Sequence, residues 1–348
     1  MGITWGAILW LVVKHERLGL DYLTVLNQMA PPKNISETAP MSGILPSQRT
    51  DAKMWVRHAI TLDEQGGGRL RYTTFDNSPQ GREVHWNSTW VWLLRRGGKV
   101  WQKLGNDSLT IPQAIAAWSY WQSLPVFLMG MVGISTWTTR RMGAGAGLFM
   151  AWGMLGSIPF LDAFFPGNSD HPGLISAAGF GMVLGLVFAG AGWWQKSNND
   201  AALLPASIPE ARRAAGYSAL CGGLGMWISA ASTIPVISIL GVSGFLMVLR
   251  KRGETTRLNF APEVWRWWGR FGALGSLLAY LIEYFFHHLS WHMEVNHPVY
   301  ALAWWGGAEL VALAINSRLI GRSRTTVRHG GGRCPIFQPV GSVHGPGA

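Results

Sequence analysis

Acidic, amide and imidazole side chains recur in three polar segments that lie between apolar runs of the sequence. The residues concerned are Asp51, Asp76, Asn77 and His85 in the first segment, Asp170 and His171 in the second, and Glu294 in the third. Carboxylates and imidazoles bind divalent cations, and they are also the commonest general acids and bases. If the fold brings the three segments together, they form a candidate catalytic or metal-binding site.

Arginines of the first segment are candidates for binding an anion. A guanidinium holds a phosphate through two parallel N–H···O hydrogen bonds, and Arg57, Arg69, Arg71 and Arg82 all lie within this segment. We expect Arg57, Arg69 and Arg71 to neutralise such a phosphate.

Simpler structural roles compete with each of these assignments. A single Asp beside a membrane is often solvated or caps a helix, and residues 76–81 are also a good turn sequence. His171 precedes Pro172 and can serve only to shape a turn. The arginines can balance nearby acids, so the chemical assignments depend on how the chain folds.

The composition indicates that the elements positioning these residues are membrane helices. Charged residues make up 14% of the 348 residues, hydrophobic residues make up 48%, and the chain holds 44 Gly and 20 Trp. Soluble proteins carry about 25% charged residues, and hydrophobicity this high excludes disorder for most of the chain. Membrane helices use small residues for close packing and Trp at the interfaces.

Apolar runs divide the sequence into eight predicted spans. The runs are 3–13, which is short for a complete span, and then 111–137, 144–165, 174–194, 214–249, 267–286 and 299–316. A straight helix over 214–249 would be about 54 Å long, whereas a bilayer core measures about 30 Å. This run must therefore fold back, and Thr233-Ile234-Pro235 is the predicted turn.

The distribution of Lys and Arg predicts how these spans are oriented. Basic residues occupy connections 138–143, 195–213 and 250–257 and the segment after 317, whereas 166–173, 233–235 and 287–298 contain none. Short cytoplasmic loops are enriched in Lys and Arg, so we expect both termini in the cytoplasm. Residues 14–108 form an external loop subdomain of the membrane domain 1–317, and 318–348 form a disordered basic cytoplasmic tail.

The remaining ionisable groups suggest other roles or none. The net charge of +11 arises mainly between the apolar runs, so nucleic acid is not an expected partner. Cys221 lies in an apolar run and Cys334 in the tail, so we expect no disulfide framework. Glu283 and Glu309 lie in or beside spans, where a carboxylate is a functional candidate by default.

The order of these pieces resembles the GT-C glycosyltransferase superfamily, and within it the bacterial relatives of the oligosaccharyltransferase catalytic subunit. The resemblance is carried by an early Asp in a long external loop, by the run Asp-Asn-x-Pro-x-Gly-x-x-x-His-Trp at 76–86, and by Pro-Gly-x-x-Asp-His at 166–171. It covers about residues 1 to 317. Those relatives have eight or more spans and take a sugar from a lipid-linked phosphate donor on the outer membrane face.

The resemblance implies a role for each candidate residue. Asp51 matches a metal ligand or catalytic base, and Asp170 with His171 matches a metal-ligand or donor-phosphate position. Asp76, Asn77 and His85 match a stretch that contacts donor or acceptor, and Glu294 stands for a later external-loop acid. The cofactor implied is a divalent cation, Mg²⁺ or Mn²⁺, and the partners are a lipid-linked sugar donor, the membrane lipid and an unnamed acceptor.

We therefore predict an all-α polytopic membrane protein that transfers sugar at the outer face of a bacterial inner membrane. Two alternatives stay open. A transporter or channel would use Glu283 and Glu309 as its intramembrane groups. A non-catalytic membrane scaffold, including a degenerate or truncated transferase, would not bring Asp51 and Asp170 together.

Overall fold

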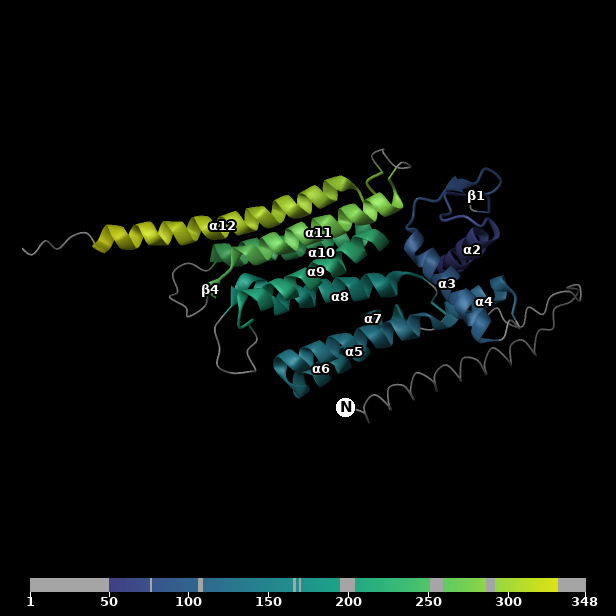
Figure 1. Ribbon diagram of the computed structural model, residues 1–348, viewed down its shortest axis with the longest axis horizontal. Helices are drawn as coiled ribbons and strands as arrows, with labels where there is room; N and C mark the ends of the chain where they lie inside the picture. Colours follow the sequence, from purple (N-terminus) through teal and green to yellow (C-terminus); the bar gives the residue numbers. More distant parts are fainter. Residues whose placement is uncertain are drawn as a thin grey trace, which may run out of the picture.

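A computed structural model of the chain describes residues 50–75, 77–105, 109–164, 167–168, 170–194, 204–250, 259–285 and 292–330. Long helices lie side by side along the longest axis of the molecule, and a smaller segment covers one end of them (Figure 1). We refer to residues 50–121 as the cap and to residues 123–330 as the bundle. The predicted spans from residue 123 onward lie in the bundle, whereas the described part of the predicted external loop and residues 111–121 form the cap.

The cap is a compact unit with its own hydrophobic cluster. Its elements are α2 (Thr50–Glu64), β1 (Tyr72–Thr73), β2 (Arg82–Glu83), α3 (Ser88–Leu104) and α4 (Ile111–Trp121). Its buried side chains include Trp55, Leu62, Trp90 and Leu94. The Asn87 side chain starts α3 by accepting a hydrogen bond from the Trp90 backbone N–H at 3.2 Å. A cap of this kind satisfies one of the free N–H groups at a helix N-terminus.

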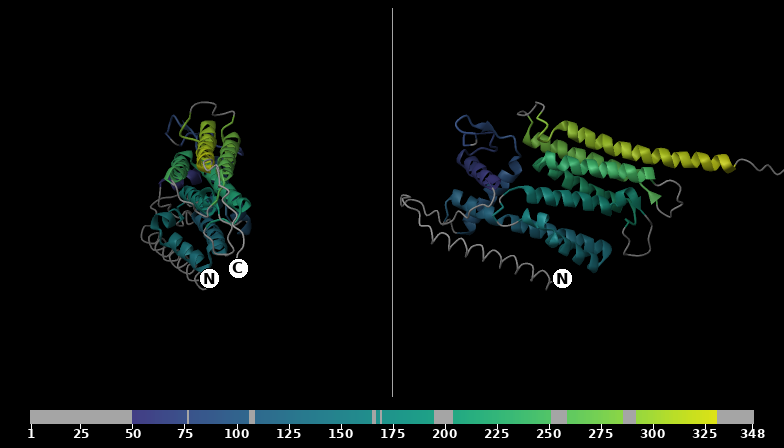
Figure 2. Two further views of the ribbon diagram at one scale, coloured as in Figure 1. Left: turned by 90° about the vertical axis from the view of Figure 1, so that its left-hand side faces the viewer. Right: turned by 180° about the vertical axis from the view of Figure 1, so that it is seen from behind.

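The bundle helices alternate in direction, so their connections gather at the cap end and at the opposite end (Figure 2). They are α5 (Ser123–Met142), α6 (Ala144–Gly156), α7 (Ile158–Asp162), α8 (Pro172–Phe188), α9 (Ile208–Ile228), α10 (Ala230–Arg250), α11 (Pro262–Glu283) and α12 (Pro298–Gly330). A 3-10 turn, η1 (Gly190–Gly192), and a short antiparallel pair, β3 (Trp193–Trp194) with β4 (Asn259–Phe260), lie at the end away from the cap.

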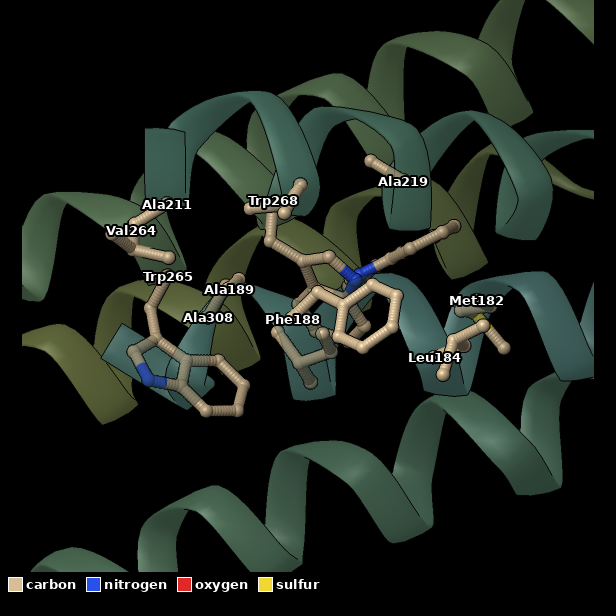
Figure 3. Packing of buried hydrophobic residues seen from close by; sticks show 14 of the residues in the cluster. Met182, Leu184, Phe188, Ala189, Ala211, Ala219, Val264, Trp265, Trp268 and Ala308 are labelled. Carbon is tan, nitrogen blue, oxygen red and sulfur yellow. The ribbon is translucent and has the colours of Figure 1, made fainter. Parts of the chain in front are cut away.

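Large aromatic side chains and glycines fill the interior of the bundle. Figure 3 shows Trp265 and Trp268 of α11 among residues of α8, α9 and α12. The Trp268 indole donates a hydrogen bond to Ser218 Oγ on α9 at 2.9 Å, so its polar group is satisfied inside the core. α9 and α11 meet at glycines, because a Cβ added to Gly223 would stand 3.2 Å from the Cα of Gly275. Small residues at such crossings allow close helix packing in lipid.

The outer surface of the bundle is strongly apolar. Phe149, Leu220, Ile239, Leu302 and Leu310 each expose more than 60% of their surface. Soluble monomers rarely expose apolar patches of this extent. Within the described residues, two helices are long and apolar enough to cross a membrane, over Ala230–Met247 and Pro298–Asn316. The predicted total of eight spans stays a prediction.

Several boundaries differ from those predicted. The chain turns back at Ser229 rather than at residues 233–235, because Ser229 has an extended backbone and its Oγ accepts from the Ser232 N–H at 3.3 Å. Pro235 lies inside α10. The single run predicted over 111–137 is two helices, which separate at Gln122. α12 continues to Gly330, so residues 318–330 extend the helix instead of beginning a disordered tail. The first predicted span lies outside the described residues.

Candidate active site

The cap and the bundle enclose a cavity of about 370 Å³ at their junction. Five of the predicted site residues line it: Asp51, His85, Asp170, His171 and Glu294. Asp51 and His85 belong to the cap, and the other three belong to connections at the cap end of the bundle. The structure therefore brings residues from all three polar segments of the sequence to one place.

Each candidate side chain stands at the end of an element or in a connection. Asp51 lies in the first turn of α2, where a negative charge is favourable beside the helix N-terminus. His85 follows β2, and Asp170 and His171 directly precede Pro172, the first residue of α8. Glu294 lies in the turn before α12. Asn296 holds that turn to α11, because its side chain accepts from Ser276 Oγ at 2.9 Å and donates to the Ser276 carbonyl at 2.8 Å.

Asp170 and His171 form a tight pair in the cavity wall. Asp170 Oδ1 accepts from the His171 backbone N–H at 2.7 Å and lies 2.5 Å from His171 Nδ1. Burial acts to raise the pKa of Asp170, but the hydrogen bonds and charge of His171, together with a hydrogen bond from Trp55, outweigh it and hold that pKa below its ordinary value. Asp170 is therefore a carboxylate at neutral pH.

At neutral pH Glu294 is ionised, whereas His85 is neutral. The pKa of Glu294 is lowered by its own backbone N–H and by the His292 ring, whose Nδ1 lies 3.3 Å from Glu294 Oε1. Burial lowers the pKa of His85, so its imidazole is neutral at pH 7. The His85 ring lies 4.1 Å from that of Trp86, centroid to centroid. A charged carboxylate and a neutral imidazole thus share this side of the cavity.

Arg82 is the single Arg or Lys among the described residues that line the cavity. Its guanidinium lies over the Trp86 ring, 4.8 Å from the ring centroid, and its Nη2 lies 3.9 Å from Met54 Sδ. A guanidinium held against an aromatic face is oriented before any ligand arrives. The sequence offered Arg82 as an anion-binding candidate, but nothing in the pattern favoured it over the other arginines.

The three arginines that we expected to meet a phosphate are elsewhere. Arg57 lies over the Phe75 ring at 5.6 Å. Arg69 and Arg71 donate to the backbone carbonyls of Ile282 and Glu283 at the end of α11. None of the three is among the residues that line the cavity. They contact groups of the chain itself in this structure, and the phosphate role predicted for them stays a prediction.

Asn77 has a structural role in the same stretch. Its backbone has a positive φ of 57°, and its side chain donates to the Gly81 carbonyl at 3.2 Å. These contacts close the turn between β1 and β2, and Asn77 does not line the cavity. Asp76 lies outside the described residues. The alternative interpretation of residues 76–81 as a turn therefore applies to Asn77.

The donor groups of the cavity suit a divalent cation, but their arrangement is not that of a formed metal site. Carboxylates and imidazoles are ligands for Mg²⁺, Mn²⁺ and Zn²⁺. Among the described residues, however, no three His, Cys, Asp or Glu side chains are grouped closely enough to hold one ion. Asp170 is also engaged by His171. We therefore derive no chemical step through a metal, and the predicted cation stays a prediction.

A larger apolar groove, of about 1010 Å³, adjoins the polar cavity. It lies between α10 and α12, and its lining includes Ile237, Phe245, Trp304 and Leu310. Met226 of α9 lines both the groove and the cavity. A long apolar ligand in the groove would therefore have its end close to the charged groups. No sequence motif marks this groove, because its lining residues are mostly apolar side chains of helices whose packing the sequence does not show.

No protein-family model and no curated protein matches the chain. Solved structures of the oligosaccharyltransferase of Archaeoglobus fulgidus do match. The apo form has a TM-score of 0.57 at 16% identity, over 86% of this chain and 32% of that one. The complex with an inhibitory peptide and a dolichol-phosphate has a TM-score of 0.56 at 14% identity, over 85% and 32%. The complex with Zn and sulfate has a TM-score of 0.55 at 14% identity, over 80% of this chain and 33% of that one.

These matches concern the fold. The chain spans about a third of the length of the archaeal protein. Its predicted resemblance to the oligosaccharyltransferases is confirmed at the level of the fold by the structural match. At 14–16% identity, the match does not assign an activity.

Proposed function

We propose that the protein is a membrane glycosyltransferase that moves a sugar from a lipid-linked phosphate donor to an acceptor. One observation carries the proposal: the polar cavity, which contains the candidate acids Asp51, Asp170 and Glu294, lies next to an apolar groove. Met226 lines both. A lipid-linked sugar has the same two parts, an apolar chain and a charged head. The oligosaccharyltransferase fold and the dolichol-phosphate bound to one archaeal structure support this choice of donor.

The donor would lie with its chain in the groove and its phosphate in the cavity. Arg82 would hold the phosphate, because it is the arginine that lines the cavity and its guanidinium is oriented by Trp86. Binding in this way places the anomeric carbon between the bundle wall and the cap wall. Alignment of donor and acceptor accounts for a large part of catalysis in transfers of this type.

The chemical step needs a base and a stabilised leaving group. A hydroxyl or amide of the acceptor attacks the anomeric carbon, and the bond between that carbon and the donor phosphate oxygen breaks. The acceptor proton passes to the Asp51 carboxylate, and the electron pair leaves with the phosphate. Arg82 stabilises the negative charge that grows on the phosphate. Asp170 keeps the His171 ring oriented beside the acceptor.

The location follows from the same arrangement. We propose a multi-pass protein of a bacterial inner membrane, with both termini in the cytoplasm and the cap on the outer face. The apolar bundle surface, and the basic residues at the end away from the cap, support this orientation. A transporter is less well supported, because the carboxylates it would use are engaged. Glu309 accepts from Arg266 at 2.8 Å and from Arg270 at 3.0 Å, and Glu283 is enclosed by donors.

The test is transfer by the purified protein in lipid nanodiscs, with a polyprenyl-phosphate-linked sugar and a mixture of candidate acceptors. Asp51→Asn and Asp170→Asn should each lower transfer by at least about a hundredfold while the protein stays folded. Asp63→Asn is the matched control, because Asp63 pairs with Arg95 and Lys99 inside the cap, at 2.8 and 2.7 Å, away from the cavity. Equal activity of all three variants and the wild type would refute the proposal.

A further inference from the structure

The cap is joined to the bundle through the carboxyl ends of two helices. The Asn87 side chain donates to the Ile228 carbonyl at 2.7 Å, at the end of α9. Arg69 and Arg71 donate to the carbonyls of Ile282 and Glu283, at the end of α11. The last carbonyls of a helix have no partner within the helix, and positive groups are favoured there. The cap thus supplies the partners that both helix ends lack.

Glu283 lies at the centre of this joint and is completely buried. Its Oε1 accepts from Ser88 Oγ of the cap at 2.7 Å, and its Oε2 accepts from Trp227 Nε1 of α9 at 3.0 Å. Its Oε1 also lies 3.5 Å from Arg71 Nη1 and 3.8 Å from Arg69 Nε. A buried charge is tolerated only when it is paired and hydrogen-bonded, and here the pairing groups come from both sides of the joint.

Several neighbours of Glu283 in the joint form walls of the cavity. Trp227 and Tyr284, its hydrogen-bond partner and its successor in the chain, both line the cavity. Asn87 and Ile228, which form the second contact of the joint, line it as well. The hydrophobic clusters of the cap and of the bundle are separate, although Leu174 of α8 packs against the cap cluster and the Trp55 ring lies 5.1 Å from the His171 ring, centroid to centroid. The polar joint adds directional hydrogen bonds and charge pairs to these apolar contacts, and so helps to set the distance between the two walls.

We propose that Glu283 is a positioning residue for the reaction, because it holds Asp51 and Arg82 of the cap in register with Asp170 and Glu294 of the bundle. This inference rests on the proposed function. Glu283 does not line the cavity and touches no substrate. It acts through Ser88, Trp227 and the two arginines, which connect it to both walls.

The charge balance of the joint gives a specific expectation for substitutions. The wild-type joint has two arginines and one carboxylate. Glu283→Gln keeps the shape but leaves two partly buried guanidinium groups without their counter-charge, which is unfavourable. Adding Arg71→Gln to Glu283→Gln restores the original net charge. We expect the double variant to recover much of the cap–bundle alignment, and of the kcat, that the single variant loses.

A distance measurement across the joint tests this inference without any need for activity. Spin labels at Gln65 of the cap and Leu302 of α12, both exposed, report the cap–bundle distance in nanodiscs, with Cys221 and Cys334 replaced by Ala. Glu283→Gln should shift or broaden this distance distribution, and Glu283→Gln with Arg71→Gln should narrow it again. Asp63→Asn should leave it unchanged. A second label pair at Leu220 and Leu310, both on the outer surface of the bundle, should not respond to Glu283→Gln.

Transfer kinetics supply the second measurement. Glu283→Gln should lower kcat by about tenfold or more with little change in the KM for the donor, because alignment fails while the donor groove is intact. The double variant should regain kcat. An unchanged distance distribution together with unchanged kcat would overturn the inference. If Glu283→Gln shifts the cap–bundle distance distribution but the wild type transfers no sugar, Glu283 does position the cap and the proposed function is wrong.

Discussion

His171 Nδ1 lies 2.5 Å from Asp170 Oδ1, in the turn that begins α8. Because this contact holds the pKa of Asp170 below its ordinary value, the pair stabilises the fold where Asp170 is ionised in both the folded and unfolded states. That stability is fully present above the unfolded pKa of about 3.9 and is lost as pH falls through the lower folded pKa.

The pH dependence of unfolding tests this pairing. We expect wild type to unfold at a higher temperature than Asp170→Asn near pH 6, with a difference that shrinks as the pH falls below about 4. Thermal unfolding in detergent, followed by tryptophan fluorescence between pH 3 and pH 7, measures the difference. If the difference in unfolding temperature stays constant down to pH 3, the neighbours of Asp170 do not stabilise its carboxylate.

Arg82 should matter for donor binding more than the other cap arginines. Arg82→Gln removes the cavity guanidinium, and the loss of a hydrogen bond to a charged group costs about 1.5–3 kcal/mol. The KM for a lipid-phosphate donor should therefore rise roughly 10- to 150-fold. Arg57→Gln is the matched control, because Arg57 lies over Phe75 outside the cavity lining, and its KM should stay near that of wild type. Steady-state kinetics at varied donor concentration distinguish the two.

Two adjacent glycines of α12 test the apolar groove. Gly307 lines the groove, whereas Gly306 does not, and an added Cβ meets no atom within 4 Å at either position. Gly307→Leu should displace part of a bound chain, and losing two or three buried methylenes costs about 2 kcal/mol, roughly a thirtyfold rise in KM. Gly306→Leu should have little effect. With a donor that carries only a short chain, both variants should have the wild-type KM. If Gly307→Leu raises KM equally for short-chain and long-chain donors, the chain does not bind in the groove.

The orientation in the membrane is open to a labelling experiment. In a variant without Cys221 and Cys334, a cysteine at the exposed position Gln65 should react with an impermeant thiol reagent added to intact cells. A cysteine at the exposed position Arg213, near the start of α9 and away from the cap, should react only after the cells are opened. The reverse pattern would place the cap in the cytoplasm and contradict the proposed outer-face reaction.

Much of the helical architecture could be predicted, because apolar runs of sufficient length must form helices in a membrane. The predicted runs 267–286 and 299–316 lie largely within α11 and α12. The turn predicted at residues 233–235, on the strength of Pro235, is wrong, because the chain turns at Ser229. Pro235 instead lies inside α10, whereas Ser229 leaves α9 with an extended backbone and its Oγ accepts from the Ser232 N–H at the start of α10.

The site was predictable in its acids and less so in its arginines. Asp51, Asp170 and Glu294 reach one cavity because an alternating bundle brings every second connection to the same end. Arg71 could not be assigned in this way, since its partner Glu283 is 212 residues away in the sequence. A carboxylate buried at the end of α11 attracts those arginines, and only the three-dimensional packing reveals that it is buried.

The contact between Gly223 and Gly275 sets how close α9 and α11 can come. Because backbone meets backbone there, the spacing of the two helix ends under the cap depends on atomic radii rather than on the size of any side chain. Exposed residues elsewhere on α9 and α11 can then change without moving the two helix ends that contact the cap. The two glycines themselves are the exception, because a side chain at either would push the two helices apart.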